Sequence, residues 1–271
     1  GGPVTGMELC GAEDIHYIDL TGGTETGRKV AAQAGERLIR STMELGGKTS
    51  IIICEDADFD GAIAGALFSA FVASGQTCVS GSRFIVHSSI YDRFTDALAV
   101  RADAIVIGDP MAEITQMGPV ISKASQVRCL RMIGKAKADG AVQIAGLTSP
   151  DLTAPFDKGF YIRPTIFKDV QSDHELFLEE VFGPVISMTP YTTEAEALEL
   201  ANTGNFGLGL SIWSRDIARA HRLSLGVRGG VVWLNDHHRN DPRSVWGGVR
   251  DSGFGKENGW DALKAYTTKK S

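Results

Sequence analysis

The segment SGQTCVSGSR at residues 74–83 places Cys78 among small residues, between a long apolar run and a strand-like run. Small neighbours let a reactant reach the sulfur, and a free backbone N–H beside it can stabilise an oxyanion. A cysteine thiolate attacks carbonyl carbons well when its pKa is lowered. The motif alone leaves two alternatives, because a single cysteine is more often an inert buried residue than a nucleophile.

Two further motifs combine carboxylates with glycine. Glu44 precedes Gly46 in the sequence MELGGK, and a glutamate held in a partly apolar pocket can act as a general base near neutral pH. Glu180 precedes Phe182 in the sequence LEEVFGPV. Each motif has an ordinary alternative, because a solvated glutamate at a strand end and a polar surface turn give the same residues.

A glycine turn, TGGTETG at residues 21–27, lies between a strand-like run and a helix-like run. Such a turn leaves free helix N–H groups, which suit a phosphate group. Gly23 lies inside this turn, and Thr24 is the candidate N-cap of the helix. The bare pattern is only weak evidence for a nucleotide site.

Alternating strand-like and helix-like runs surround these motifs and predict an α/β fold with a mainly parallel sheet. The helix expected at 58–74 is apolar all round and should be buried in a sizeable domain. Strands are expected at 14–20, 40–45, 50–54, 83–87, 141–145, 185–188, 208–213 and 230–234, and helices at 24–39, 58–74, 90–104, 122–139, 193–202 and 216–223.

Composition excludes several classes of protein. The chain has 271 residues, 43% hydrophobic and 22% charged, which is ordinary for a globular protein. A net charge of −6 argues against nucleic acid or an anionic membrane as the main partner. No two of the four cysteines are closely spaced, and no apolar run is long enough to span a membrane. We therefore expect no metal site, a reducing cytoplasmic location, and structural roles for Cys10, Cys54 and Cys129.

Taken together and in this order, the motifs resemble those of the aldehyde dehydrogenase superfamily. TGGTETG is similar to the family's TGS-T-x-x-G turn, MELGGK to its general-base motif, GQTCVSGSR to its nucleophile motif and EEVFGPV to its cofactor-ribose motif. The segments ANTGNFGL, VWLN and WGGVRDSGFG also resemble family sequences. Cys78 follows Glu44 by 34 residues, as in the family, and the resemblance runs from Gly2 to about Lys270.

The resemblance implies oxidation of a small-molecule aldehyde to a carboxylic acid, with NAD or NADP as the cofactor. Cys78 would attack the aldehyde to give a thiohemiacetal, and loss of hydride to the cofactor would leave a thioester. Water activated by Glu44 would then hydrolyse the thioester. Glu180 would hold the nicotinamide-side ribose, Phe182 would pack near the nicotinamide, and Gly46 would lie along the cofactor.

Some positions depart from the family pattern. Gly23 replaces the usual serine, so we expect weaker or altered cofactor binding. Trp246 replaces the more common phenylalanine near the substrate tunnel. The loop Asn235–Trp246 is unusually polar, and we hypothesise that Arg239 in this loop selects an anionic aldehyde. The alternative is that the charges of this loop face solvent; an Arg239→Ala variant that affects acidic and neutral aldehydes equally would favour it.

Family members are roughly twice as long as this chain. We therefore expect residues 1–46 to be the C-terminal remnant of a truncated Rossmann-like cofactor domain, and residues 47–245 to be the catalytic domain. Residues 246–271 should return to the cofactor domain and begin a subunit-bridging strand. The family's bridging strand makes a homodimer or homotetramer the expected assembly.

Three explanations of this length stay open. The chain is part of a full aldehyde dehydrogenase, or a truncated relative with cofactor-independent thiol chemistry such as an esterase or isomerase, or a non-catalytic scaffold of the kind found among lens proteins. Retention of both Cys78 and Glu44 disfavours the scaffold, which needs neither residue. Turnover of an aldehyde with NAD+ separates the first two explanations.

Overall fold

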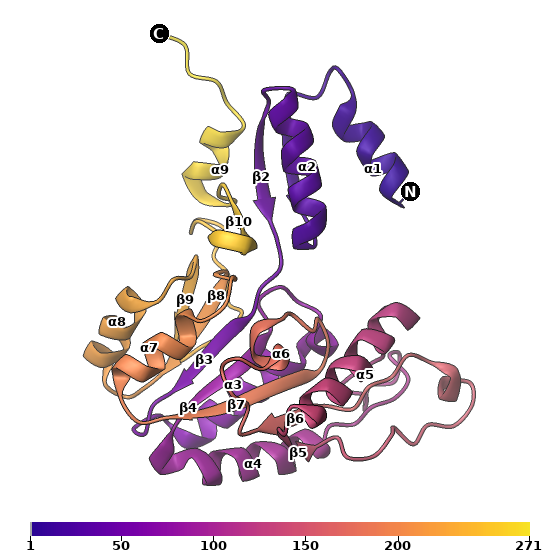
Figure 1. The fold of residues 1–271 in the computed structure, drawn as a ribbon, viewed down its shortest axis with the longest axis vertical. Helices are drawn as coiled ribbons and strands as arrows, with labels where there is room; N and C mark the ends of the chain where they lie inside the picture. Colours follow the sequence, from indigo (N-terminus) through magenta and orange to yellow (C-terminus); the bar gives the residue numbers. More distant parts are fainter. Residues whose placement is uncertain (1) are drawn as a thin grey trace.

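The protein contains two sheets of very different size (Figure 1). The computed structural model describes residues 2–271. The smaller sheet has the order β1-β2-β10, and it stands with α2 and both chain ends to one side of a larger body. Its strands are β1 (Tyr17–Thr21), β2 (Arg40–Glu44) and β10 (Gly253–Phe254).

The larger sheet has seven strands in the order β5-β6-β7-β4-β3-β8-β9. Every neighbouring pair is parallel except β5 and β6, which confirms the predicted α/β fold with a mainly parallel sheet. The strands are β3 (Thr49–Ile53), β4 (Gly81–His87), β5 (Val142–Ala145), β6 (Thr165–Lys168), β7 (Val185–Tyr191), β8 (Gly209–Trp213) and β9 (Val231–Leu234).

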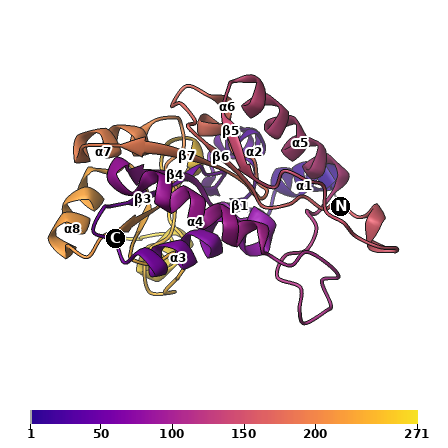
Figure 2. The same ribbon diagram turned by 90° about the horizontal axis from the view of Figure 1, so that it is seen from below.

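Helices cover both faces of the larger sheet, because successive side chains of a strand point to opposite faces. Ile51 and Ile53 of β3 pack in one core with α3 and α4, whereas Ile52 packs in another with α7 and α8. Figure 2 shows α3 and α4 side by side on one face of the larger sheet. The α-helices are α1 (Gly2–Gly11), α2 (Thr24–Glu36), α3 (Phe59–Phe71), α4 (Tyr91–Asp103), α5 (Lys123–Ala138), α6 (Glu175–Leu178), α7 (Glu194–Asn202), α8 (Ile217–Gly226) and α9 (Gly259–Ala265).

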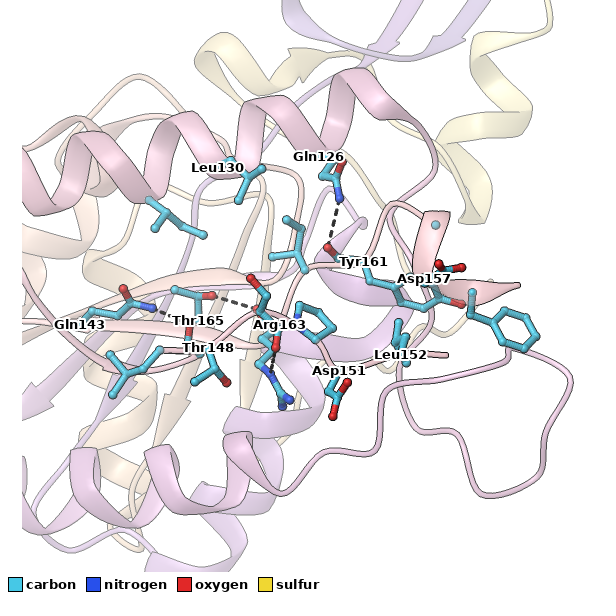
Figure 3. A pocket seen from close by; sticks show the side chains of 18 of the residues that line it. Gln126, Leu130, Gln143, Thr148, Asp151, Leu152, Asp157, Tyr161, Arg163 and Thr165 are labelled. Atoms are coloured by element: carbon cyan, nitrogen blue, oxygen red, sulfur yellow. Dashed lines mark hydrogen bonds between the residues drawn. The ribbon is translucent and has the colours of Figure 1, made fainter. Parts of the chain in front are cut away.

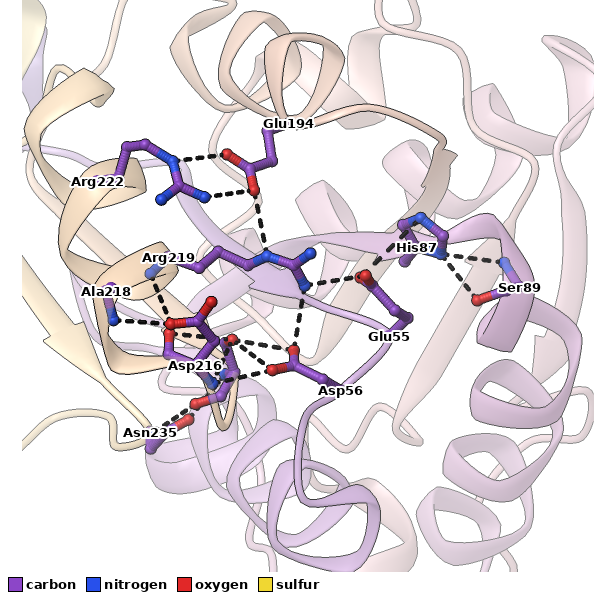
Figure 4. A network of polar contacts seen from close by, with 11 residues as sticks. Glu55, Asp56, His87, Ser89, Glu194, Asp216, Ala218, Arg219, Arg222 and Asn235 are labelled. Atoms are coloured by element: carbon purple, nitrogen blue, oxygen red, sulfur yellow. Dashed lines mark hydrogen bonds and ion pairs between the residues drawn. The ribbon is translucent and has the colours of Figure 1, made fainter.

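Ion pairs tie α7 and α8 to the carboxyl end of β3, and we call this group the carboxyl-end network (Figure 4). Arg219 of α8 lies 2.9 Å from a Glu55 oxygen, 3.3 Å from Asp56 and 3.1 Å from Glu194. The Ser214 hydroxyl also donates to Asp56 at 2.9 Å. The network comprises Glu55, Asp56, Glu194, Ser214, Asp216, Arg219 and Arg222.

Several expectations about single elements were wrong. Gly23 rather than Thr24 is the N-cap of α2, because Thr24 is already the first helical residue; its hydroxyl donates to the backbone carbonyl of Asp251 at 3.1 Å. The apolar helix α3 is not buried all round, since Phe68 is 51% exposed. Sequence reasoning also missed α1, which buries no side chain of its own.

The C-terminal residues form no strand in the part of the chain that the structure describes. Residues 266–271 follow α9 as irregular chain in this single subunit, and a strand that pairs with another subunit stays a prediction. The carbonyl of Thr267 instead accepts a hydrogen bond from Arg40 at 3.0 Å. In the described range 2–271, no helix is both long and apolar enough to cross a membrane.

Candidate active site

A cavity of about 700 Å³ lies where the carboxyl ends of β1 and β2 meet the segments that lead into β4 and β7. It brings together Cys78, Glu180, Phe182, Gly46 and Gly23, which come from four motifs spread over 160 residues of sequence. The lining residues are Thr21, Gly22, Gly23, Leu45, Gly46, Gln76, Thr77, Cys78, Arg128, Glu180 and Phe182.

A sharp reversal after α3 delivers Cys78 to this cavity. The helix expected to continue to Ser74 ends at Phe71, because Ala73 and Ser74 adopt left-handed backbone angles, with φ of 51° and 57°. Such angles strain residues other than glycine. The Ser74 hydroxyl holds the reversal by donating to the Gly118 carbonyl at 3.0 Å.

Two glycines of the motifs are required by close backbone contacts. A Cβ atom on Gly47 would lie 2.2 Å from the carbonyl oxygen of Cys78, so no side chain fits there. A Cβ atom on Gly75, which has a φ of +70°, would lie 2.5 Å from the carbonyl oxygen of Gly183. The MELGGK and EEVFGPV segments therefore pack directly against the backbone around Cys78.

The Cys78 thiol is half-buried, and its environment keeps it protonated at neutral pH. Burial, followed by the negative charges of Glu180 and Glu44, raises its pKa to about 11. The backbone amides of Cys78 and Val79 oppose this shift, because they donate toward the sulfur. The Cys78 thiol must therefore lose its proton to a base before its sulfur can attack a carbonyl carbon.

Glu44 ends β2 and is only 3% exposed. Burial, with a smaller contribution from the charge of Glu257, raises its pKa to about 7. Neither carboxylate oxygen has a partner at normal hydrogen-bond geometry among the described residues, and the nearby Lys256, Gly248 amide and Trp246 offset only part of the rise in pKa. A buried carboxylate with this pKa can exchange protons near neutral pH, which suits a general base.

Glu180 lines the same cavity as Cys78. It accepts a hydrogen bond from the Gly47 amide at 2.8 Å, while burial raises its pKa. Phe182 has a left-handed φ of 53° and lines the same cavity. Arg128 of α5 also reaches the cavity and donates to the Val181 carbonyl at 2.8 Å. Sequence analysis missed Arg128, because nothing distinguishes it from the other basic residues of that helix.

The cavity fits a nucleotide cofactor at its β1 edge. The 13-residue helix α2 begins at Gly23 without a side-chain cap, so its first amides are available to an anion. No other atom lies within 4 Å of the position that a Cβ on Gly23 would take. Gly46 and the Glu180 carboxylate lie further along the same cavity.

The two predicted substrate residues differ in their placement. Trp246 packs in the same apolar cluster as Cys78, with its ring centroid 6.2 Å from that of Trp233. Arg239 does not line the Cys78 cavity, because its side chain is 83% exposed and pairs with Asp236 at 3.0 Å. The structure therefore does not bring Arg239 to the nucleophile.

A second cavity of about 460 Å³ lies between α5 and the loop that leads to β6 (Figure 3). Gln126 of α5 crosses it to donate to the carbonyl of Tyr161 at 3.3 Å. It shares no lining residue with the Cys78 cavity. Within residues 2–271, no group of three or more His, Cys, Asp or Glu side chains is arranged to hold a metal ion.

Comparison with known proteins decides the family. The model of the aldehyde dehydrogenase family matches residues 1–271. This chain belongs to the aldehyde dehydrogenase family. The betaine aldehyde dehydrogenase of Brucella anthropi is 43% identical over 250 residues, and that of Brucella melitensis is 42% identical. Each alignment covers 92% of this chain and 51% of the relative.

Solved structures of aldehyde dehydrogenases agree with the fold described above. The betaine aldehyde dehydrogenase of Staphylococcus aureus in complex with NAD+ superposes with a TM-score of 0.93 at 36% identity, over 96% of this chain and 52% of that one. The aldehyde dehydrogenase of Bacillus cereus gives 0.92 at 36% identity, over 97% and 52%. The chain thus spans about half the length of these aldehyde dehydrogenases.

Proposed function

We propose that this chain carries the catalytic machinery of an NAD(P)+-dependent aldehyde dehydrogenase, which oxidises an aldehyde to a carboxylic acid. The observation that carries the proposal is the single cavity shared by Cys78, Glu180, Phe182, Gly46 and the open start of α2 at Gly23. Family membership supports it, as does the NAD+ held by the Staphylococcus aureus relative.

The chain's own residues account for the acyl chemistry. The Cys78 sulfur bonds to the aldehyde carbon, and the carbonyl oxygen becomes an oxyanion that the Cys78 amide can stabilise. When bound, NAD(P)+ supplies the hydride acceptor that converts the thiohemiacetal to a thioester. Glu44 then takes a proton from water, the resulting hydroxide adds to the thioester carbon, and the C–S bond breaks to release the acid.

The same residues would hold the cofactor. The amides at the start of α2, beside Gly23, suit a phosphate, and the Glu180 carboxylate suits the hydroxyls of a ribose. Gly46 allows the Glu180 carboxylate to lie directly against the backbone, since a Cβ there would come within 2.7 Å of it, and Phe182 offers an apolar surface to the nicotinamide. Because Gly23 has no hydroxyl, only backbone groups can meet a phosphate at that position.

The test is turnover of betaine aldehyde, the substrate named for the relatives, with NAD+ and separately with NADP+. We expect reduced cofactor to accumulate with the unmodified chain and not with Cys78→Ala. No accumulation with either cofactor, at any of a set of aliphatic, cationic and acidic aldehydes, would contradict the proposal for this chain. Light scattering on the same sample tests the proposed homodimer or homotetramer.

A second candidate is cofactor-independent ester hydrolysis. It is favoured by one observation: the Cys78 sulfur, the two amides that face it and Glu44 all belong to this chain. Hydrolysis of 4-nitrophenyl acetate that disappears in Cys78→Ala, without any NAD(P)+-dependent turnover, would support this candidate over the dehydrogenase.

A further inference from the structure

A buried histidine outside the cavity holds the turn that carries the nucleophile. His237 follows β9 and is only 4% exposed. Its Nε2 lies 2.8 Å from the Val79 carbonyl oxygen, and its Nδ1 lies 2.6 Å from the Ser211 hydroxyl. A carbonyl can only accept, so Nε2 carries the proton and Nδ1 accepts from Ser211. Burial lowers the pKa of His237 to about 4, so the ring stays neutral in this arrangement.

The turn spans Thr77–Ser80, with Cys78 and Val79 at its two central positions. The Ser80 amide donates to the Thr77 carbonyl at 3.0 Å, and the hydroxyl oxygens of Thr77 and Ser80 lie 2.8 Å apart. The Cys78 carbonyl packs against Gly47. The remaining central carbonyl, that of Val79, is held by His237, so the orientation of both central peptides is fixed from outside the turn.

That orientation matters because the amides of Cys78 and Val79 face the sulfur. An amide directed at a sulfur stabilises the thiolate over the thiol, and it can also stabilise an oxyanion formed beside the sulfur. The Val79 amide shares a peptide unit with the Cys78 carbonyl, whereas His237 holds the next peptide unit by the Val79 carbonyl. If that second unit is released, the backbone at Val79 can shift and the Val79 amide can turn away from the sulfur. Loss of that donor should lower the thiolate fraction at a given pH.

His237 is itself held on several sides. Its ring stacks on that of His238 at 6.0 Å and an interplanar angle of 10°, and its centroid lies 4.9 Å from that of Trp233. His238 in turn meets the edge of Phe68, on the helix that leads into the nucleophile turn. Besides His238, the charged group that acts on His237 is Asp236.

We propose that His237 is a positioning residue for Cys78: its Nε2–H holds the Val79–Ser80 peptide by its carbonyl, which restrains the backbone of Val79 and so helps to keep the adjoining Cys78–Val79 peptide, with its amide, directed at the sulfur. The inference rests on the proposed function only in taking Cys78 as the nucleophile. His237 is the first histidine of the loop Asn235–Trp246, whose charged side chains were expected either to contact the substrate or to face solvent. The proposal gives His237 a buried role instead.

The test compares two variants that both remove the ring. The side-chain amide of His237→Gln can take the place of the Nε2 donor, whereas His237→Asn is too short to reach the Val79 carbonyl but can still meet Ser211. Alkylation of Cys78 by iodoacetamide is followed against pH, with the modified residue identified by peptide mass spectrometry. We expect His237→Asn to react about tenfold more slowly at pH 8, with its profile moved up by about one pH unit.

His237→Gln should restore the rate to within about twofold of the unmodified chain, which a merely structural role of the ring would not explain. His87→Asn, at the far end of the sheet, is the matched histidine control and should leave the profile unchanged. If His237→Asn and His237→Gln react alike, or both match the unmodified chain, the proposal is overturned. If His237→Asn does not fold, Ser211→Ala takes its place in the test. It should shift the pH profile of Cys78 alkylation in the same direction by a smaller amount. An unchanged profile overturns the proposal.

This readout needs neither cofactor nor aldehyde, so it is separate from the test of the dehydrogenase. If the chain shows no turnover but His237→Asn is alkylated more slowly than His237→Gln, the proposed function is refuted and the positioning role is supported. If the chain turns over, His237→Asn should lower kcat about tenfold and leave KM within about twofold, because the substrate's own contacts are unchanged.

Discussion

The two ends of the seven-stranded sheet treat their polar side chains in opposite ways. At the carboxyl ends, the acidic groups of the carboxyl-end network are matched by Arg219 and Arg222 and by hydrogen bonds such as that from Ser214. At the amino ends of β3 and β4, several buried polar atoms have no hydrogen-bond partner in the described part of the chain. We call these residues the amino-end cluster: Glu44, Lys48, Thr49, Ser50, Ser82 and Arg83.

The unpaired polar groups of the amino-end cluster lie at the end of the sheet where the proposed reaction would take place. Parallel α/β sheets commonly bind ligands beyond the carboxyl ends of their strands. Here that end is closed by ion pairs, and the Cys78 cavity lies at the other end, beneath the smaller sheet. Unpaired buried polar groups destabilise the fold, and they are also the groups available to a ligand or to a reacting proton.

The largest expected effect is on activity at the amino end. Cys78→Ser should lower turnover by about 10³-fold or more, because the serine hydroxyl is a far weaker nucleophile in this site. The matched control is Cys54→Ser, which changes a buried cysteine just beyond the carboxyl end of β3. Turnover measured for both should fall only in Cys78→Ser; an equal fall in Cys54→Ser would break the comparison.

Glu44→Gln should lower the rate of thioester hydrolysis by about 10²-fold, because the amide cannot take a proton from water. The activity of the unmodified chain should rise with pH through about 7, as the Glu44 carboxyl loses its proton. Pre-steady-state measurement of acyl-enzyme decay against pH checks both statements. A variant that keeps this ascending limb would assign it to another group.

The same substitution should stabilise the fold. The pKa of Glu44 is raised from 4.5 to about 7, so the folded state holds the proton more tightly than the unfolded chain does. The unfavourable contribution of Glu44 therefore grows as pH rises from about 4.5 to 7 and is complete above that range. Urea unfolding at pH 8 should show Glu44→Gln more stable by about 1–3 kcal/mol, and no more stable at pH 4.

Arg219→Ala should lower the free energy of unfolding by about 2 kcal/mol, because Glu55, Asp56 and Glu194 then lose a shared, largely buried partner. Turnover should stay within about twofold, since no network residue lines the Cys78 cavity. Arg222→Ala is the control: Arg222 is 59% exposed, so its loss should cost less than about 1 kcal/mol. Equal losses would mean that burial does not set the strength of these pairs.

A further effect on stability is expected at Lys48, whose ammonium is buried without a hydrogen-bond partner. Burial lowers its pKa from 10.5 to about 7, so the folded state favours the neutral amine. Lys48→Met should therefore add about 1–4 kcal/mol of stability at pH 6, and the gain should fade as pH rises from about 7 to 10.5. Urea unfolding at pH 6 and 10 tests this, with the exposed Lys135→Met as the control.

The sequence was sufficient to predict the parallel sheet. Five predicted residues, Gly23, Gly46, Cys78, Glu180 and Phe182, line one cavity, because the glycines of their motifs allow close packing, whereas Glu44, Trp246 and Arg239 do not line it. Gly47 packs against the backbone of Cys78, and Gly75 packs against the backbone of Gly183, at positions where no side chain would fit. Contacts between distant side chains could not be predicted in the same way. Whether Arg239 turns to Asp236, or His237 to Val79, depends on which partner the fold brings within reach.

Glu44, the proposed base, and Cys78, the proposed nucleophile, belong to separate cores, which are joined by residues 45–48 between β2 and β3 and by the longer segment from β9 to β10. Glu44 ends β2, whose core contains Ile18, Val30, Ala34, Met43 and Leu45, whereas Cys78 leads into β4 of the larger sheet. Local melting of the smaller core would therefore remove the base while the thiol remained seated. The proposed phosphate site at the start of α2 belongs to the same smaller core. On warming, NAD(P)+-dependent turnover should therefore be lost while Cys78 can still be alkylated, before the larger sheet unfolds.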